Sequence, residues 1–128
     1  MKSAPMLDHI SIAVASVSRS KTFYAATLGS LGYGVVHESG VSVGFGLGKK
    51  PEFGIFAAAA DASPVAQHIA FTAGSRSAVD RWHVAALAAG GVCNGAPGLR
   101  AEYHANYYGA FAIDPDGNNV EAVCHTAP

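Results

Sequence analysis

The sequence has few charged residues and few cysteines, and both shortages exclude classes of protein. Only 13% of its 128 residues are charged, and the formal net charge is −1. A polycationic nucleic-acid binder is therefore excluded, and attraction to an anionic membrane surface is not expected. The two cysteines, Cys93 and Cys124, form neither a CxxC pair nor a dense disulfide pattern, which favours a reducing compartment.

Long hydrophobic runs are also missing. No stretch approaches the roughly 20 apolar residues that a membrane span needs, and residues 1–5 have no hydrophobic segment of signal-peptide length. We therefore expect a cytoplasmic protein whose partner is a small molecule. Half of the residues are nonetheless hydrophobic, and a chain of this length buries enough surface for a core. We expect one domain over residues 1–128.

The sequence contains an internal repeat. A shift of 59 positions, the separation of His9 and His68, aligns the two halves without a gap over their first elements. Both halves open on an alternating stretch, residues 7–14 and 65–72, in which aliphatic side chains occupy one face and the histidine the other. The repeat therefore predicts two similar modules, each beginning with a half-buried strand.

Each opening strand is followed by a helix and by further strands. Helical spacing predicts helices from about residue 18 to 28 and after a capping box of Ser77 and Asp80. Residues 92–99 are interrupted by Asn, Gly and Pro, which makes a strand there doubtful. The other strands are predicted at residues 33–38, 41–47, 53–57, 107–113 and 118–124.

The predicted fold class is α+β, with two tandem βαβββ modules at about 7–60 and about 65–125. Counting along the strands makes Ile55 the first-module equivalent of Glu121. The second module is then longer by seven residues, which fall around residues 99–106. A polar and aromatic loop of this kind is expected to act as a lid or rim.

The two equivalent histidines suggest a metal site. His9 and His68 each lie on a strand face beside small residues. If a twofold axis relates the modules, equivalent positions come together, and Glu121 on the last strand can add a carboxylate. Two imidazoles and a carboxylate with open coordination positions suit a catalytic divalent ion. The alternative, a structural histidine held by hydrogen bonds, stays open.

Three segments resemble the glyoxalase/bleomycin-resistance/dioxygenase superfamily, also called vicinal oxygen chelate proteins. They are residues 8–10 (Asp-His-Ile), 67–71 (Gln-His-Ile-Ala-Phe) and 111–123, which contain Asp-Pro-Asp-Gly-Asn-Asn-Val-Glu. The resemblance covers nearly the whole chain. It implies a curved, partly open barrel-like sheet around a cleft, with His9 and His68 among the metal ligands and Glu121 as the carboxylate.

The chain also departs from the patterns that the resemblance implies. Glyoxalase I enzymes have a fourth ligand, which also moves protons, on the last strand of the first module. Ile55 takes that position in our count and can do neither, which disfavours this activity unless Glu52 replaces it. Extradiol dioxygenases use a His, His, Glu triad for Fe(II), but their pattern has a tyrosine where this chain has Phe111.

Several residues near the predicted cleft are candidate substrate contacts or catalysts. Arg100 is suited to hold a substrate carboxylate in a bidentate contact. His104, in the extra loop, is a candidate general acid or base, or alternatively a solvated loop residue. Glu121 is the second catalytic candidate. The candidate substrate contacts are Phe45, Phe53, Ile55, Arg100, Tyr107 and Tyr108.

Two function hypotheses follow. The leading one is an enzyme with one divalent metal ion (Fe, Zn, Ni, Mn or Co) that acts on a small substrate chelating the metal through neighbouring oxygens, by lyase, isomerase or extradiol dioxygenase chemistry. The alternative is a non-catalytic protein of the same fold that sequesters a drug or antibiotic. Either is compatible with a homodimer, and neither involves nucleic acid or membrane.

Overall fold

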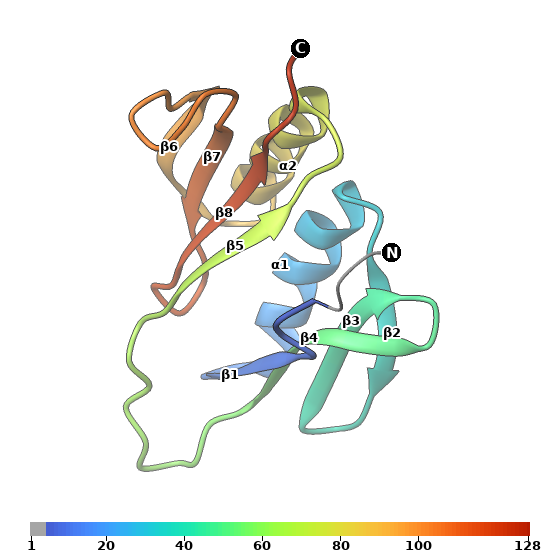
Figure 1. Ribbon diagram of the computed structural model, residues 1–128. Helices are drawn as coiled ribbons and strands as arrows, with labels where there is room; N and C mark the ends of the chain where they lie inside the picture. Colours follow the sequence, from blue (N-terminus) through green and yellow to red (C-terminus); the bar gives the residue numbers. More distant parts are fainter. Residues whose placement is uncertain (1–4) are drawn as a thin grey trace.

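The computed structural model describes residues 5–128 and contains two four-stranded sheets and two helices (Figure 1). The strand order is β1-β4-β3-β2 in the first sheet and β5-β8-β7-β6 in the second. In chain order the elements are β1 (Ile10–Val14), α1 (Val17–Ser30), β2 (Gly34–Glu38), β3 (Ser42–Leu47), β4 (Lys50–Ala57), β5 (His68–Thr72), α2 (Arg76–Ala88), β6 (Val92–Leu99), β7 (Tyr108–Ile113) and β8 (Asn119–Cys124). The predicted α+β fold is confirmed, and neither sheet closes into a barrel.

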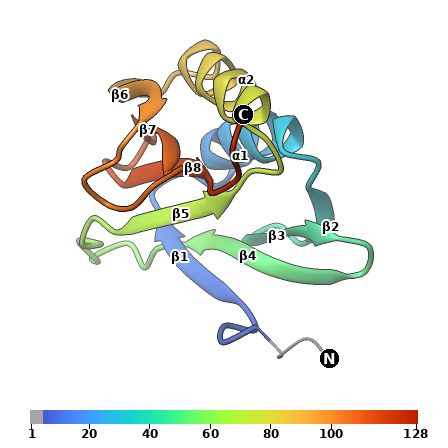
Figure 2. The same cartoon turned by 45° about the horizontal axis from the view of Figure 1, so that its top comes forward.

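The repeat is visible in the backbone. In each sheet the first and last strands of a module run parallel and pair, β1 with β4 and β5 with β8. Figure 2 shows the two helices side by side, with β5 and β4 beneath them. Within residues 5–128, no helix combines the length and apolarity that crossing a membrane requires.

Both helices begin at equivalent serines. The Ser16 hydroxyl accepts a hydrogen bond from the Arg19 amide, and the Ser75 hydroxyl accepts one from the Ala78 amide. The predicted capping box at Ser77 is therefore wrong, because α2 begins two residues earlier. Ser75 already satisfies a free amide of the first turn, which is the role of a helix cap.

Residues 92–99 form a strand, although the Asn, Gly and Pro residues in this segment make a strand doubtful from the sequence. β6 pairs with β7, and the pairing register shifts on both sides of Gly95. β6 is one of the two edge strands of its sheet. An edge strand tolerates Pro97, because a missing N–H that faces away from the sheet removes no ladder hydrogen bond.

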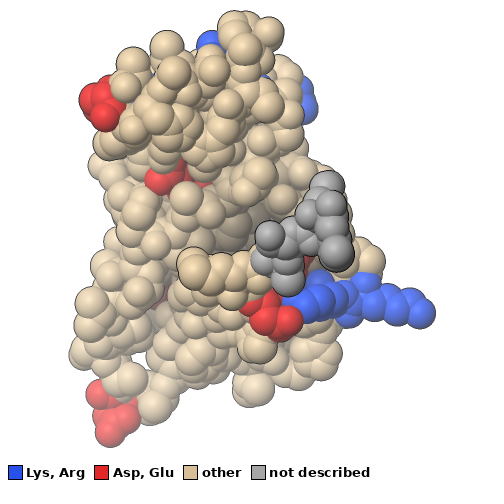
Figure 3. All heavy atoms as spheres, viewed as in Figure 1, with Lys and Arg blue, Asp and Glu red and all other residues tan. Residues whose placement is uncertain are grey.

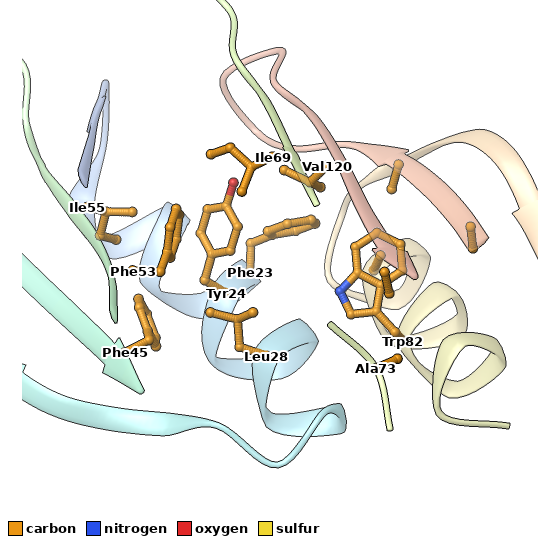
Figure 4. Packing of buried hydrophobic residues seen from close by; sticks show 14 of the residues in the cluster. Phe23, Tyr24, Leu28, Phe45, Phe53, Ile55, Ile69, Ala73, Trp82 and Val120 are labelled. Carbon is orange, nitrogen blue, oxygen red and sulfur yellow. The ribbon is translucent and has the colours of Figure 1, made fainter. Parts of the chain in front are cut away.

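One hydrophobic core spans both modules (Figure 4). α1 packs against α2, and the fully buried rings of Phe23, Tyr24 and Trp82 come from these helices. The Tyr24 ring lies 4.9 Å from that of Phe53, which lies 5.1 Å from that of Phe71 on β5. Side chains of the two modules therefore interleave in a single core.

A buried carboxylate joins the modules. Asp114, which is 4% exposed, accepts hydrogen bonds from the amides of Asp116 and Asn118, from the Asn118 side chain and from the Tyr24 hydroxyl. Asp114 follows β7, whereas Tyr24 lies on α1. The β7–β8 turn is therefore attached directly to the first module.

The same turn holds the start of α1. The Asp116 carboxylate accepts hydrogen bonds from the Ala15 amide at 2.9 Å and from the Ser20 hydroxyl at 3.2 Å. A carboxylate near a helix N-terminus is also favoured by the helix dipole. The two acidic residues of the turn thus fix the position of α1 relative to the second sheet.

Removing the Tyr24 hydroxyl is expected to destabilise the fold. Tyr24→Phe should lower the free energy of unfolding by about 1.5–3 kcal/mol, because the buried Asp114 loses a hydrogen bond. Tyr33→Phe is the control, since the Tyr33 hydroxyl reaches only a backbone carbonyl, that of Thr72, at 3.3 Å; it should cost about 1 kcal/mol or less. Urea unfolding of the three proteins measures the difference, and equal losses would contradict the role of Asp114.

Alkaline pH should weaken the same contact. Burial, with the neighbouring Asp114 carboxylate, raises the pKa of Tyr24 far above its ordinary value. The unfolded chain loses this proton near pH 10, so the stabilisation is complete below about pH 10 and is lost as pH rises further. We expect the free energy of unfolding to fall less steeply above about pH 10 in Tyr24→Phe than in the wild type. Identical slopes in urea unfolding would contradict this.

Candidate functional site

The side chain of Glu121 is the centre of the candidate site. It lies on β8 and is 3% exposed. One carboxylate oxygen, Oε1, lies 2.9 Å from His68 Nε2. The other, Oε2, accepts a hydrogen bond from the Tyr107 hydroxyl at 2.5 Å. Burying a carboxylate is costly unless it is paired, so both neighbours compensate the charge of Glu121.

The orientation of the His68 ring is informative. Its Nδ1 lies 3.1 Å from the backbone oxygen of Asn119, while its Nε2 faces Glu121. Carbonyl and carboxylate oxygens only accept hydrogen bonds, so Nδ1 carries a proton. Nε2 is then the ring nitrogen that faces the carboxylate. A histidine whose Nδ1–H is held by a carbonyl is oriented as metal-binding histidines are.

An aromatic stack lies beside this pair. Phe111 on β7 is directly opposite Glu121, and its ring stacks on the His68 ring with centroids 6.2 Å apart. The Arg100 guanidinium lies 5.3 Å from the Phe111 centroid and donates to two backbone carbonyls of β6 at 2.8 and 2.9 Å. The guanidinium of Arg100, a predicted substrate contact, is therefore held against β6 and the Phe111 ring, and Arg100 is not among the residues that line the cavity of His68.

The loop between β6 and β7 carries Tyr107 and His104. The Tyr107 ring lies 4.8 Å from Tyr103 and 5.2 Å from His104, and His104 stacks on His125 at 4.6 Å. Burial and the hydrogen bond to Glu121 raise the pKa of Tyr107. Tyr107 is thus held against Glu121, and His104 packs against Tyr107. A catalytic role for His104 stays a prediction.

His9 directly precedes β1 and has a different environment. Its side chain is 66% exposed, and its Nδ1 lies 2.8 Å from the Asp8 carboxylate. The Lys50 ammonium donates to the Asp8 backbone oxygen at 2.6 Å. The hydrogen bond with His9, together with the Lys50 charge, lowers the pKa of Asp8. Asp8 therefore orients the His9 ring and leaves its Nε2 free.

A cavity of about 400 Å³ lies between the modules. Both His9 and His68 line it, and so does Glu52. The predicted substrate contacts Phe45 and Phe53 are among its apolar walls. Figure 3 shows that few acidic or basic side chains lie on this face of the molecule. The cavity therefore suits a small, largely uncharged ligand or the apolar part of a charged one.

The chain brings His68 and Glu121 together without a third donor. In the part of the chain that the structure describes, residues 5–128, no group of three or more His, Cys, Asp or Glu side chains could hold a metal ion. His9 is paired with Asp8, whereas His68 is paired with Glu121. β1, which follows His9, and β5, which begins at His68, each lie at one edge of their sheet.

The sequence matches the family model of the Glyoxalase/Bleomycin resistance protein/Dioxygenase superfamily over residues 6–122. The chain belongs to this superfamily. It is 30% identical, with a TM-score of 0.80, to a glyoxalase/bleomycin resistance protein from Albidiferax ferrireducens, a match that covers 93% of this chain and 98% of that one. The resemblance predicted from residues 8–10, 67–71 and 111–123 is confirmed.

More distant superfamily structures share the fold. A glyoxalase/bleomycin resistance protein/dioxygenase family enzyme from Burkholderia phytofirmans is 21% identical, with a TM-score of 0.72 and coverage of 93% of this chain and 98% of that one. A glyoxalase-related enzyme from Fulvimarina pelagi is 14% identical, with a TM-score of 0.71 and coverage of 94% and 88%. A comparison with curated proteins gave no match.

The strand pairing in the two modules corrects one assignment made from the sequence. Glu121 pairs with Ala70, the repeat equivalent of Ser11, and Ser11 pairs with Gly54. The first-module equivalent of Glu121 is therefore Gly54, and the assignment of Ile55 is wrong. A shift of one residue moves a strand side chain to the other face, and Ile55 is accordingly a core residue, 1% exposed.

Tyr108, a predicted substrate contact, lies on the opposite face of β7 from Phe111. Its hydroxyl donates to Asp80 of α2 at 2.7 Å, and the Arg76 guanidinium lies 5.2 Å from its ring centroid. Alternation along the strand explains this position. Tyr107 and Phe111 share the Glu121 face, whereas Tyr108 ties β7 to α2.

The absence of a side chain at Gly54 predicts weak glyoxalase I activity. Metal-loaded protein should turn over a hemithioacetal slowly, because the fourth ligand and proton carrier of glyoxalase I has no counterpart there. A steady-state assay checks this. Efficient turnover that Glu52→Gln abolishes would assign that role to Glu52, and efficient turnover in both proteins would contradict the prediction.

Proposed function

We propose that this protein is a divalent-metal-dependent enzyme whose small substrate chelates the metal through neighbouring oxygens. The metal ligands are His9, His68 and Glu121. The observation that carries this proposal is the buried Glu121 carboxylate facing His68 Nε2 at 2.9 Å, with His68 Nδ1 held by a backbone carbonyl. An imidazole and a carboxylate oriented in this way fit two positions of such a metal site.

The third ligand, His9, comes in this proposal from a second copy of the chain. β1 and β5 are edge strands, and the residues before and at the start of β1 include Met6 and Leu7, which are 94% and 65% exposed. Apolar side chains beside an open strand edge favour association. A symmetric dimer would give two equivalent sites, each combining His9 of one protomer with the other two ligands of its partner.

The surrounding residues suit chemistry on a small chelating substrate. When bound, the metal supplies a Lewis acid, or the site of O₂ activation if it is iron. Phe45 and Phe53 exclude water from the cavity, and Arg100 binds a substrate carboxylate. His104 gives or takes a proton from the loop above Tyr107. These roles are compatible with lyase, isomerase or extradiol dioxygenase chemistry.

A second candidate function is sequestration of a small aromatic compound without chemistry. It is favoured by the cavity of about 400 Å³, whose walls include Tyr33, Phe45, Phe53 and Phe71. Aromatic walls bind flat apolar molecules through burial and stacking. In that case binding would not depend on His9, His68 or Glu121.

The proposal predicts how metal content changes in variants. The wild type should bind one equivalent of divalent metal per chain, and His9→Ala, His68→Ala and Glu121→Ala should each abolish it. His37→Ala is the matched control, since His37 is another exposed histidine of the first sheet. Elemental analysis of the purified proteins, with circular dichroism to check folding, makes the measurement. Full metal content in all three variants would contradict the ligand assignment.

Mixed dimers test whether the site is shared. A heterodimer of His9→Ala and His68→Ala chains keeps one intact site if the ligands come from two chains, and none if they come from one. Metal in the purified heterodimer, with none in either parent homodimer, is the expected result. Metal-free heterodimers would contradict the shared site. Tight binding of an aromatic compound by metal-free wild type would favour sequestration.

A further inference from the structure

The Tyr107 hydroxyl forms a hydrogen bond with one of the two carboxylate oxygens of Glu121. It donates to Oε2 at 2.5 Å, while Oε1 faces His68 Nε2 at 2.9 Å. A short hydrogen bond to a charged acceptor is stronger than one between neutral groups. The hydroxyl therefore restricts rotation of the carboxylate and leaves Oε1 as the oxygen directed toward His68.

The Tyr107 ring is itself held in place by the extra loop. The rings of Tyr103, His104 and His125 lie 4.8, 5.2 and 5.4 Å from it. The Arg100 amide donates to the Tyr107 backbone oxygen at 2.6 Å, which closes the loop at its base. Because these contacts come from both the loop and the end of β8, the hydroxyl has little freedom to leave Glu121.

The neighbouring residue shows that this contact is specific to one face of β7. Tyr108 also donates its hydroxyl to a carboxylate, that of Asp80, at 2.7 Å. Asp80 lies on α2, on the other side of the strand from Glu121. The chain thus offers two adjacent tyrosines with similar hydrogen bonds, of which only Tyr107 contacts the candidate site.

We infer that Tyr107 is a positioning residue, which orients Glu121 so that a single oxygen, Oε1, is presented to a metal shared with His68. This inference rests on the proposed metal-dependent function. With Oε2 engaged by the hydroxyl, Glu121 binds through one oxygen and leaves more coordination positions open for a chelating substrate. Mutation of a group that hydrogen-bonds to a metal ligand typically lowers metal affinity about 10- to 100-fold.

The test compares Tyr107→Phe with Tyr108→Phe. Tyr107→Phe keeps the packed ring and should weaken Co²⁺ or Zn²⁺ binding about 10- to 100-fold in competition with a chelator, because the carboxylate becomes free to rotate. Tyr108→Phe should retain the wild-type affinity. The visible spectrum of bound Co²⁺ is the second readout: freeing Oε2 raises the coordination number, so its bands should weaken in Tyr107→Phe alone.

A second variant covers the case in which Tyr107→Phe does not fold. Tyr103 is 58% exposed and contacts the Tyr107 ring without a hydrogen bond to Glu121 or His68. Tyr103→Ala should therefore weaken metal binding several-fold on its own, and unchanged affinity in this variant would overturn the inference if Tyr107→Phe does not fold. If Tyr107→Phe folds, Tyr103→Ala should have no further effect in that background. Additive losses in the double variant would overturn the inference, since Tyr103 would then act by another route.

The outcomes separate this inference from the proposed function. Wild-type protein that binds no divalent metal would overturn both. Wild-type protein that binds metal, with unchanged affinity and Co²⁺ spectrum in Tyr107→Phe, would overturn only the role of Tyr107. Equal losses in Tyr107→Phe and Tyr108→Phe would also overturn it, because they would reflect loosening of β7 and not orientation of Glu121.

Discussion

Asp114 accepts four hydrogen bonds in a position that is almost closed to solvent, and one of them comes from Tyr24 in the other module. A carboxylate buried this deeply is tolerable only when its oxygens are fully paired. The tight β7–β8 turn supplies the local donors, and α1 supplies the remaining one. Since β8 carries Glu121 and α1 follows directly from β1, this contact also fixes the strand of Glu121 relative to the first module.

The two modules share one backbone arrangement, but equivalent positions on the same face of each sheet carry different residues. The second module presents Glu121 with Phe111 directly opposite, whereas the first presents Gly54 opposite Gly44. The filled face can bury a carboxylate, because aromatic rings and a tyrosine hydroxyl surround it. The glycine face lines a pocket beside His9 together with the polar side chains of Ser11, His37 and Ser42, but it provides no carboxylate. This difference explains why His68 meets a carboxylate of its own sheet, whereas His9 is paired with the adjacent Asp8.

Much of the fold could be predicted from the sequence, because both halves of the repeat show the same order of elements. The positions of both helices and the equivalence of His9 and His68 in the repeat depend only on a constant shift between the two halves. No bulge interrupts this shift in the first elements of each half. The equivalence of Gly54 and Glu121 could not be predicted. The β3–β4 pairing register shifts after Phe45, and a count of residues along the sequence does not reveal that shift. The contact of Tyr107 with Glu121 was missed for a similar reason. It depends on where the extra loop returns to the sheet, which sequence alternation does not specify.

The two histidine side chains are both more than half exposed, 66% for His9 and 52% for His68, and they share one feature that bears on how a site is completed. Each has its Nδ1 occupied by an oxygen, Asp8 for one and a backbone carbonyl for the other, so Nε2 is the nitrogen left for a further partner. For His68 that partner is the Glu121 carboxylate, whereas His9 Nε2 has no hydrogen-bond partner within residues 5–128. An imidazole that is already oriented loses less entropy when its ring is fixed by a ligand, which favours binding at His9 Nε2.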